Sequence, residues 1–322
     1  MNQTEELTAW RLFRCNWIVL GAMALALALA LALSRFSLKP AGALLPLGIA
    51  ATYLAVAYYK ASRLRGGDPM IAFILASTGQ VLLIPLLMTP MTYIAASADL
   101  PLQDATLAGL DRALGLDWHA YFALMSKYHI VVVSSVLGYS MIGWPLFGVP
   151  VVLGLSRRYR RLQEFTLAFA LALIATTVIT ALVPAIGVYD VHAFTRSDPV
   201  FSSEAYLEHL RDFPHVRDGT LRTLDLINLT GIVTFPSFHA AAAIVYLWSF
   251  WAVWWMRPIA LLANGGMLLA TPFIGGHYFV DVFAGIAIAA AAIMAARWIT
   301  DRLSRPVKAK TAYLPESAVP AE

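Results

Sequence analysis

Residues 24–33 read Ala-Leu-Ala-Leu-Ala-Leu-Ala-Leu-Ala-Leu, an alternation that on its own resembles a β-strand. Both residue types are strong helix formers, and the uncharged stretch around them, residues 15–34, is about twenty residues long. A helix of that length crosses about 30 Å of hydrocarbon at a rise of about 1.5 Å per residue. We therefore predict a membrane-spanning helix here and not a strand.

Long apolar stretches run through the rest of the chain. Of its 322 residues, 60% are hydrophobic and 13% are charged, whereas soluble domains contain about 45–50% apolar and about 25% charged residues. A membrane β-barrel would show segments of about ten residues with alternating polarity. The sequence therefore predicts an all-α polytopic membrane protein. Its eight expected spans are residues 15–34, 41–59, 70–97, 130–155, 165–187, 237–256, 258–275 and 278–299.

The distribution of Lys and Arg predicts the orientation of these spans, because cytoplasmic segments carry an excess of basic residues. With the N-terminus inside, 15 of the 23 Lys and Arg residues fall on inner segments and 8 fall on the longer outer ones. We therefore expect both termini in the cytoplasm. His239 then opens the sixth span and His277 the eighth, both on the outer, non-cytoplasmic side.

Two regions outside the spans have a predicted character of their own. Within residues 98–129, Leu107, Leu110 and Leu114 fall on one helical face and the charged residues lie elsewhere. This pattern predicts an amphipathic helix that lies in the headgroup region. Residues 300–322 are expected to form a disordered cytoplasmic tail.

The composition argues against disulfides, zinc sites and nucleic-acid binding. Cys15 is the single cysteine, so an internal disulfide and a cysteine-based zinc site are excluded. The net charge of +4 reflects basic loops, and a nucleic-acid partner is not expected. The histidines interpreted as loop residues, and not as zinc ligands, are His119, His129, His192, His209 and His215.

Two short segments at the mouths of spans concentrate groups suited to catalysis. Residues 235–241 read Phe-Pro-Ser-Phe-His-Ala-Ala, and residues 275–281 read Gly-Gly-His-Tyr-Phe-Val-Asp. An imidazole titrates near neutrality and can act as a nucleophile, acid or base. Asp281 follows His277 by one helical turn, so its carboxylate can fix the tautomer of that imidazole. If the segments meet, His239, His277 and Asp281 form one site.

The start of the sixth span also suits an anion. Pro236 fits the first turn of a helix and Thr234 is the expected cap, which leaves Ser237 and nearby amides at the positive helix end. Such an end binds phosphate readily. One histidine can attack phosphorus while a second protonates the leaving oxygen. These parts therefore fit phosphoryl transfer.

The sequences Pro-Ser-Phe-His (236–239) and His-Tyr-Phe-Val-Asp-Val (277–282) resemble the second and third signature motifs of the type 2 phosphatidic acid phosphatase superfamily. They are most similar to the branch that contains fungal inositol phosphorylceramide synthase and its bacterial relatives. The resemblance implies His277 as nucleophile, Asp281 as its orienting partner and His239 as the acid for the leaving group. It implies no metal or other cofactor.

The resemblance covers residues 100–299 and implies a six-helix core. We therefore expect N-terminal transmembrane helices in residues 1–97 and a catalytic membrane domain in residues 98–299, before the tail.

The chain departs from the wider superfamily at its phosphate-holding cations. Ala270-Thr271 stands where the third motif usually begins with Ser-Arg, the first motif with its Lys and Arg-Pro is missing, and Phe238 replaces a usual Gly. The inositol phosphorylceramide synthase branch also lacks the Ser-Arg pair, which favours the narrower assignment. Transferred phosphate charge needs positive partners. Our candidates to supply them are Arg217 and Arg222, just upstream of the second motif.

We therefore expect a phosphohistidine enzyme that moves an inositol-phosphate-like head group from a phospholipid to a lipid alcohol such as ceramide or diacylglycerol. The alternative is a phosphatase with water as acceptor, acting on phosphatidate-like or polyprenyl phosphates. A lipid transporter or flippase is a third possibility, but it would predict an internal repeat and charges near the bilayer midplane.

Overall fold

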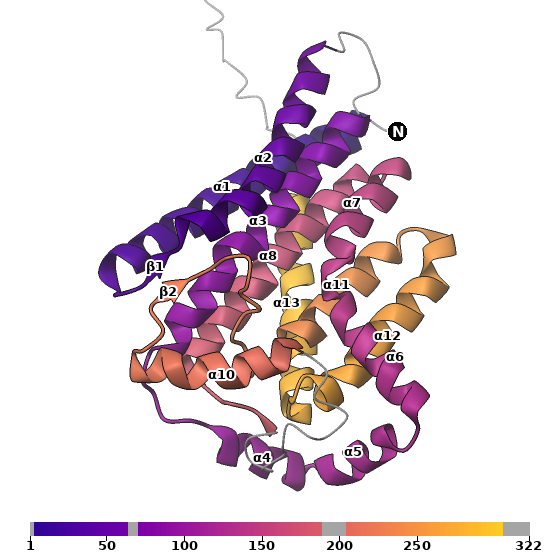
Figure 1. Ribbon diagram of the computed structural model, residues 1–322. Helices are drawn as coiled ribbons and strands as arrows, with labels where there is room; N and C mark the ends of the chain where they lie inside the picture. Colours follow the sequence, from indigo (N-terminus) through magenta and orange to yellow (C-terminus); the bar gives the residue numbers. More distant parts are fainter. Residues whose placement is uncertain (1–2, 64–69, 189–203, 305–322) are drawn as a thin grey trace, which may run out of the picture.

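The computed structural model describes residues 3–63, 70–188 and 204–304, and these are nearly all helical, as the sequence predicts (Figure 1). The long helices are α1 (Gln3–Leu33), α2 (Pro40–Arg63), α3 (Met70–Ala96), α8 (Tyr159–Leu182), α12 (Arg257–Ile274) and α13 (Phe279–Ser304). The shorter helices are α4 (Asp104–Ala113), α5 (Trp118–Ser126), α6 (His129–Ser140), α7 (Pro145–Leu155), α10 (Glu204–Asp218) and α11 (Phe238–Phe250). The remaining elements are the 3₁₀ turns η1 (Met141–Gly143) and η3 (Trp254–Met256) and the parallel strand pair β1 (Ser37–Leu38) and β2 (Thr223–Leu224).

Six of the eight expected spans are confirmed by length and composition within the described residues: α1, α2, α3, α8, η3 with α12, and α13. The other two are interrupted. Residues 130–155 divide into α6, η1 and α7, and Pro145, which has no N–H to continue a helix, begins α7. The connection before α6 is also bent, by 109° between α5 and α6. Residues 237–256 shorten to α11, which ends at Phe250.

The short helix α11 lies inside the bundle. It packs against α8, α12 and α13, and none of its residues is exposed. Its 13 residues reach about 20 Å, which is less than the hydrocarbon thickness. Neighbouring helices surround it along this length. Ala240 to Ala243 are fully buried, and their small side chains allow close helix packing.

Helix α4 forms where an amphipathic helix was expected, but its orientation differs from the prediction. Leu107 is buried, whereas Leu110 and Leu114 are 48% and 60% exposed. Asp104 and Asp111 are buried instead. The acidic face turns inward because its carboxylates accept hydrogen bonds from backbone amides of the α8–α10 connection and of the start of α13.

The two described ends of the chain meet at one end of the bundle. Thr8 Oγ1 donates to Ser304 Oγ at 3.3 Å, and Arg11 donates to the Leu303 carbonyl at 2.6 Å. Helices α4, α5 and α10 lie at the opposite end (Figure 1). This arrangement suits termini on one membrane side, and their cytoplasmic assignment stays a prediction. Residues 300–304 continue α13, so the expected tail cannot begin before residue 305, and 305–322 lie outside the described residues.

Candidate active site

Ser237 sets the start of α11. Its side chain accepts the N–H of Ala240 at 3.4 Å, and its own amide donates to the Asp281 carbonyl at 3.0 Å. These two bonds make Ser237 the cap, so the expectation that Thr234 caps the helix is wrong. Pro236 accordingly precedes the cap and does not occupy the first turn.

His277 lies in the loop between α12 and α13, two residues before α13 begins. Gly276 has a φ of 63°, which glycine adopts without strain. Gly275 lies against Tyr139, and a Cβ there would come within 2.7 Å of the tyrosine ring and hydroxyl. The two glycines therefore permit close approach, by the Tyr139 side chain at Gly275 and by the backbone of Val188, whose amide donates to the Gly276 carbonyl at 2.8 Å.

Asp111 of α4 holds the start of α13 in place. Its carboxylate accepts the amides of Phe279 at 2.8 Å and Val280 at 2.9 Å. These amides have no partner within the helix, so Asp111 caps α13 from a different helix. Burial raises the pKa of Asp111, and the two amide hydrogen bonds oppose that rise.

Ser237, His277 and Asp281 form a buried chain of hydrogen bonds. Nδ1 of His277 lies 3.2 Å from Oδ2 of Asp281, and Nε2 of His277 lies 3.3 Å from Oγ of Ser237. The side chain of His277 is 4% exposed and that of Asp281 0%. In its ionised form Asp281 can only accept, and this form puts the His277 proton on Nδ1 and leaves the lone pair on Nε2. The contact expected from the four-residue spacing is present, although His277 reaches Asp281 from the loop and not from the helix.

Burial lowers the pKa of His277 to about 4. The charged form is disfavoured because the low-dielectric interior solvates it poorly. The imidazole is therefore neutral at physiological pH, and the neutral form is the one that can attack an electrophile.

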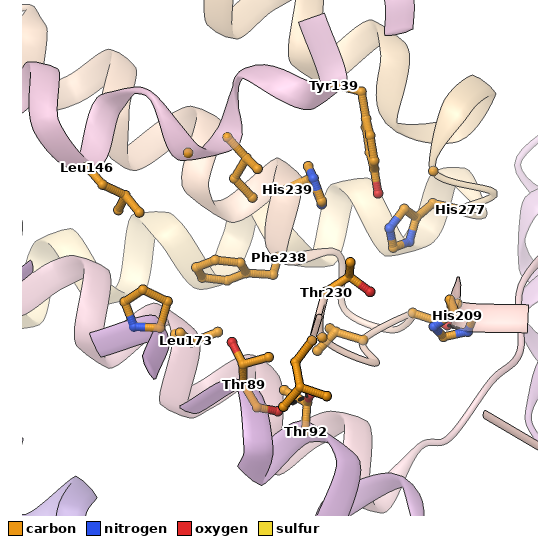
Figure 2. Close-up of a pocket in the computed structure, with 18 of the residues that line it drawn as sticks. Thr89, Thr92, Tyr139, Leu146, Leu173, His209, Thr230, Phe238, His239 and His277 are labelled. Atoms are coloured by element: carbon orange, nitrogen blue, oxygen red, sulfur yellow. Dashed lines mark hydrogen bonds between the residues drawn. The ribbon is translucent and has the colours of Figure 1, made fainter. Parts of the chain in front are cut away.

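The two histidine motifs meet in one cavity of about 280 Å³, which both His239 and His277 line (Figure 2). The ring of His239 stacks on Tyr139, with centroids 3.8 Å apart and an angle of 10° between planes. A Cβ at Gly285 of α13 would overlap the Ser237 carbonyl oxygen. The absence of a side chain at Gly285 therefore lets α13 approach α11 closely enough for both motifs to reach the cavity.

A third histidine, His209 of α10, lines the same cavity, although the sequence placed it among the loop residues. Its Nε2 lies 3.1 Å from the Ile186 carbonyl oxygen and 3.3 Å from Thr234 Oγ1. Burial, reinforced by the charge of His277, lowers the pKa of His209 to about 4. No motif surrounds this residue in the sequence, so only the folded chain identifies it.

The rest of the cavity wall is neutral. Its described lining residues include no Lys or Arg. Hydroxyl groups come from Thr89, Thr92, Thr230, Thr234, Tyr139 and Tyr246. Apolar surface comes from Pro85, Ile142, Leu146, Phe169, Leu173 and Phe238. The cavity thus joins a polar part, with the histidines, to an apolar part.

Arg217 and Arg222 do not line this cavity. Arg217 donates to Asp99 Oδ1 at 2.8 Å and to the Leu100 carbonyl at 2.9 Å. Arg222 donates to the Val216 carbonyl at 2.7 Å, and its guanidinium lies 4.6 Å from the centre of the Phe36 ring. The structure therefore does not bring these two arginines together with the histidines, because each guanidinium is held by groups outside the cavity.

Across the described ranges, no group of three or more His, Cys, Asp or Glu side chains is placed to hold a metal ion.

Comparison with known proteins gives the class to which this architecture and site belong. The family model of the PAP2 superfamily matches residues 105–295, which is more than half of the chain. The chain belongs to the PAP2 superfamily, whose members are phosphatase-type enzymes, and membership supports a lipid phosphatase or phosphotransferase function. No curated protein and no solved structure matches the chain.

Proposed function

We propose that this protein moves a phosphorylated head group from a membrane phospholipid to a lipid alcohol, through an intermediate on His277. The observation that carries the proposal is the buried chain of Asp281, His277 and Ser237 beside a cavity that His239 also lines. The groups needed for nucleophilic attack and for proton transfer thus face one space.

The first step forms a bond from His277 Nε2 to phosphorus and breaks the bond from phosphorus to the glycerol oxygen. Asp281 stabilises the positive imidazole that results. His239, which carries a second proton when the anionic phosphodiester is bound, gives that proton to the departing oxygen, so diacylglycerol leaves. In the second step His239 takes the proton of the acceptor hydroxyl, whose oxygen displaces His277 from phosphorus. Ser237, released from Nε2, can donate to a phosphate oxygen beside the amides at the start of α11.

The charge of the cavity favours a phosphodiester as donor. A diester carries one negative charge, whereas a phosphate monoester carries about 1.5 to 2 near neutrality. Burying a second charge without a cation is unfavourable, and the described lining residues include no Lys or Arg. The intact head group of a phospholipid therefore fits better than phosphatidate. This is the argument for head-group transfer, including transfer of an inositol-phosphate-like group, over the phosphatase alternative.

We place the reaction at the outer leaflet, with donor and acceptor both in the bilayer. The cavity lies at the end of the bundle away from the chain termini, and its apolar wall suits a lipid chain. A transporter or flippase would not need a nucleophile paired with a carboxylate.

The experiment that tests the proposal supplies the purified full-length protein in nanodiscs with a phospholipid labelled in its phosphate. A new labelled phospholipid that requires added lipid alcohol indicates transferase activity, and water-soluble label indicates hydrolysis. Inertness in both conditions, across inositol and glycerol head groups, would contradict the proposal. We expect activity to survive EDTA, since the proposed steps use only protein side chains.

We further propose that His209 supplies the positive charge that the missing arginines would provide. A bound phosphate favours the protonated form of a nearby imidazole, and hydrogen bonds to charged groups contribute about 1.5–3 kcal/mol. His209→Gln keeps a donor for the Ile186 carbonyl but cannot become charged. We expect this variant to raise KM about 10- to 100-fold and to change kcat less, as measured by steady-state kinetics.

The matched control is His215→Gln, on the same helix but with a side chain 56% exposed. It removes one histidine from α10 without altering the cavity, so its KM should equal that of the wild type. Equal KM values for both variants would show that His209 has only a packing role.

A further inference from the structure

A second hollow, of about 440 Å³, lies at the end of the bundle opposite the histidine cavity, between the starts of α1 and α8 and the last third of α13. Its charged lining residues are Arg157, Arg158, Arg160, Arg161, Arg297, Glu5 and Glu164. Five arginines face two glutamates, so this surface is strongly positive.

The ion pairs of the described residues neutralise only part of this charge. Arg160 donates to Glu164 at 2.9 Å and to Asp301 at 3.0 Å. Arg158 and Arg297 have no carboxylate oxygen within 4.0 Å in the part of the chain that the structure describes. The positive charges of Arg158, Arg160 and Arg297 repel the positive charge of Arg161.

Arg161 has a fixed position and one N–H group without an acceptor among the described residues. Its guanidinium lies 4.0 Å from the centre of the Trp248 ring, which fixes its position. Its Nη1 is buried and has no hydrogen-bond partner among the described residues. A buried donor without an acceptor is unfavourable, and an anionic oxygen in the hollow would satisfy it.

The start of α8 also favours the binding of an anion in the hollow. Arg158 occupies the N-cap position of α8, but its side chain makes no capping hydrogen bond. No acidic residue occupies the first turn. Positive side chains at a helix N-terminus oppose the helix dipole, and an anion there would interact favourably with it. The general excess of basic residues in cytoplasmic loops explains the number of these arginines. It does not explain why they surround one hollow at the start of a helix whose N-cap side chain makes no hydrogen bond.

We propose that this hollow is a binding site for a phosphate group, separate from the proposed catalytic cavity and at the opposite membrane surface. Arginine forks match phosphate oxygens in geometry and charge, and the positive N-terminal end of α8 lies at the same hollow. The phosphate belongs either to the head group of an anionic lipid or to a soluble phosphate compound.

The test measures the melting temperature of the full-length protein in phosphatidylcholine micelles, with phosphatidylglycerol added in one arm and inorganic phosphate in the other. The Arg158→Ala/Arg297→Ala variant removes two charges that have no carboxylate partner. Arg257→Ala is the matched control, because Arg257 lies at the same end and donates to the Trp251 carbonyl outside the hollow. We expect a rise of about 5 °C for the wild type and the control at a ligand concentration of about 100 times Kd. The rise for the double variant should be less than about half as large, since phosphatidylglycerol can still enter the proposed catalytic cavity.

A rise confined to phosphatidylglycerol identifies a lipid head group, and a rise with inorganic phosphate identifies a soluble compound. Equal shifts in the double variant and the control, or no shift in the wild type, would overturn the proposal. The double variant should keep the wild-type transfer activity in phosphatidylcholine, so this result is independent of the proposed catalytic function.

Discussion

His277→Ala is expected to reduce phosphoryl transfer by at least about 10⁴-fold, because the variant has lost the atom that we propose attacks phosphorus. The side chain lies beside a cavity of about 280 Å³, so the bilayer-spanning helices should be little disturbed. The measurement is the initial rate of product formation from labelled phospholipid, with the protein in nanodiscs. Acid-stopped samples should also contain protein-bound label in the wild type and none in the variant.

The control for this variant is His119→Ala, an exposed histidine of α5. It should leave both the rate and the protein-bound label unchanged. Labelled protein from the His277 variant, at the wild-type level, would show that another residue is the nucleophile.

The same assignment predicts a pH dependence. Burial lowers the pKa of His277 to about 4, and protonation removes the lone pair that attacks phosphorus. The rate should therefore be level from neutral pH to about 5 and fall as the pH drops through about 4. A nitrophenyl phosphodiester is the suitable substrate, because its leaving group needs no proton. An acid limb centred near 6.5, the value of an exposed histidine, would contradict the assignment.

His239→Ala is the second variant with a large expected effect. General acid catalysis contributes about 10² to 10⁴ in rate, and an alkoxide is a poor leaving group without a proton. We therefore expect a loss of that size with a phospholipid donor. With the nitrophenyl phosphodiester, formation of the phosphoenzyme should proceed within about threefold of the wild-type rate.

Tyr139→Phe provides the matched control, since it keeps the ring that stacks on His239 and removes only the hydroxyl. It should retain most of the activity toward both substrates. If His239→Ala lost the same factor with both substrates, the residue would act by binding or positioning and not as an acid.

The parts of the site that are close in sequence could be predicted well. Asp281 and His277 are only four residues apart, so the turn that leads into α13 brings their side chains together. The charge rule for membrane proteins placed both histidine motifs at one end of the bundle. That both motifs line one cavity agrees with that prediction.

Contacts between distant segments could not be predicted in this way. His209 has no motif, and α10 brings it to the cavity through contacts with residues 186 and 234. Arg217 and Arg222 stand near the second motif in sequence, yet their guanidinium groups bind elsewhere. In α4, hydrogen bonds to distant amides outweigh the amphipathic pattern and turn Asp111 inward.

The sequence by itself determined that this is a helical membrane protein, because long uncharged runs cross hydrocarbon as helices, which satisfy their own backbone groups. It also determined the His277–Asp281 pair, because the two residues are close in the chain. Only the tertiary structure decided which residues surround that pair. Gly285 lets α13 approach Ser237, Asp111 caps α13 from another helix, and His209 takes a place in the cavity wall. These features depend on packing between segments that are far apart in the chain, and the pattern of one segment contains no information about its neighbours in space.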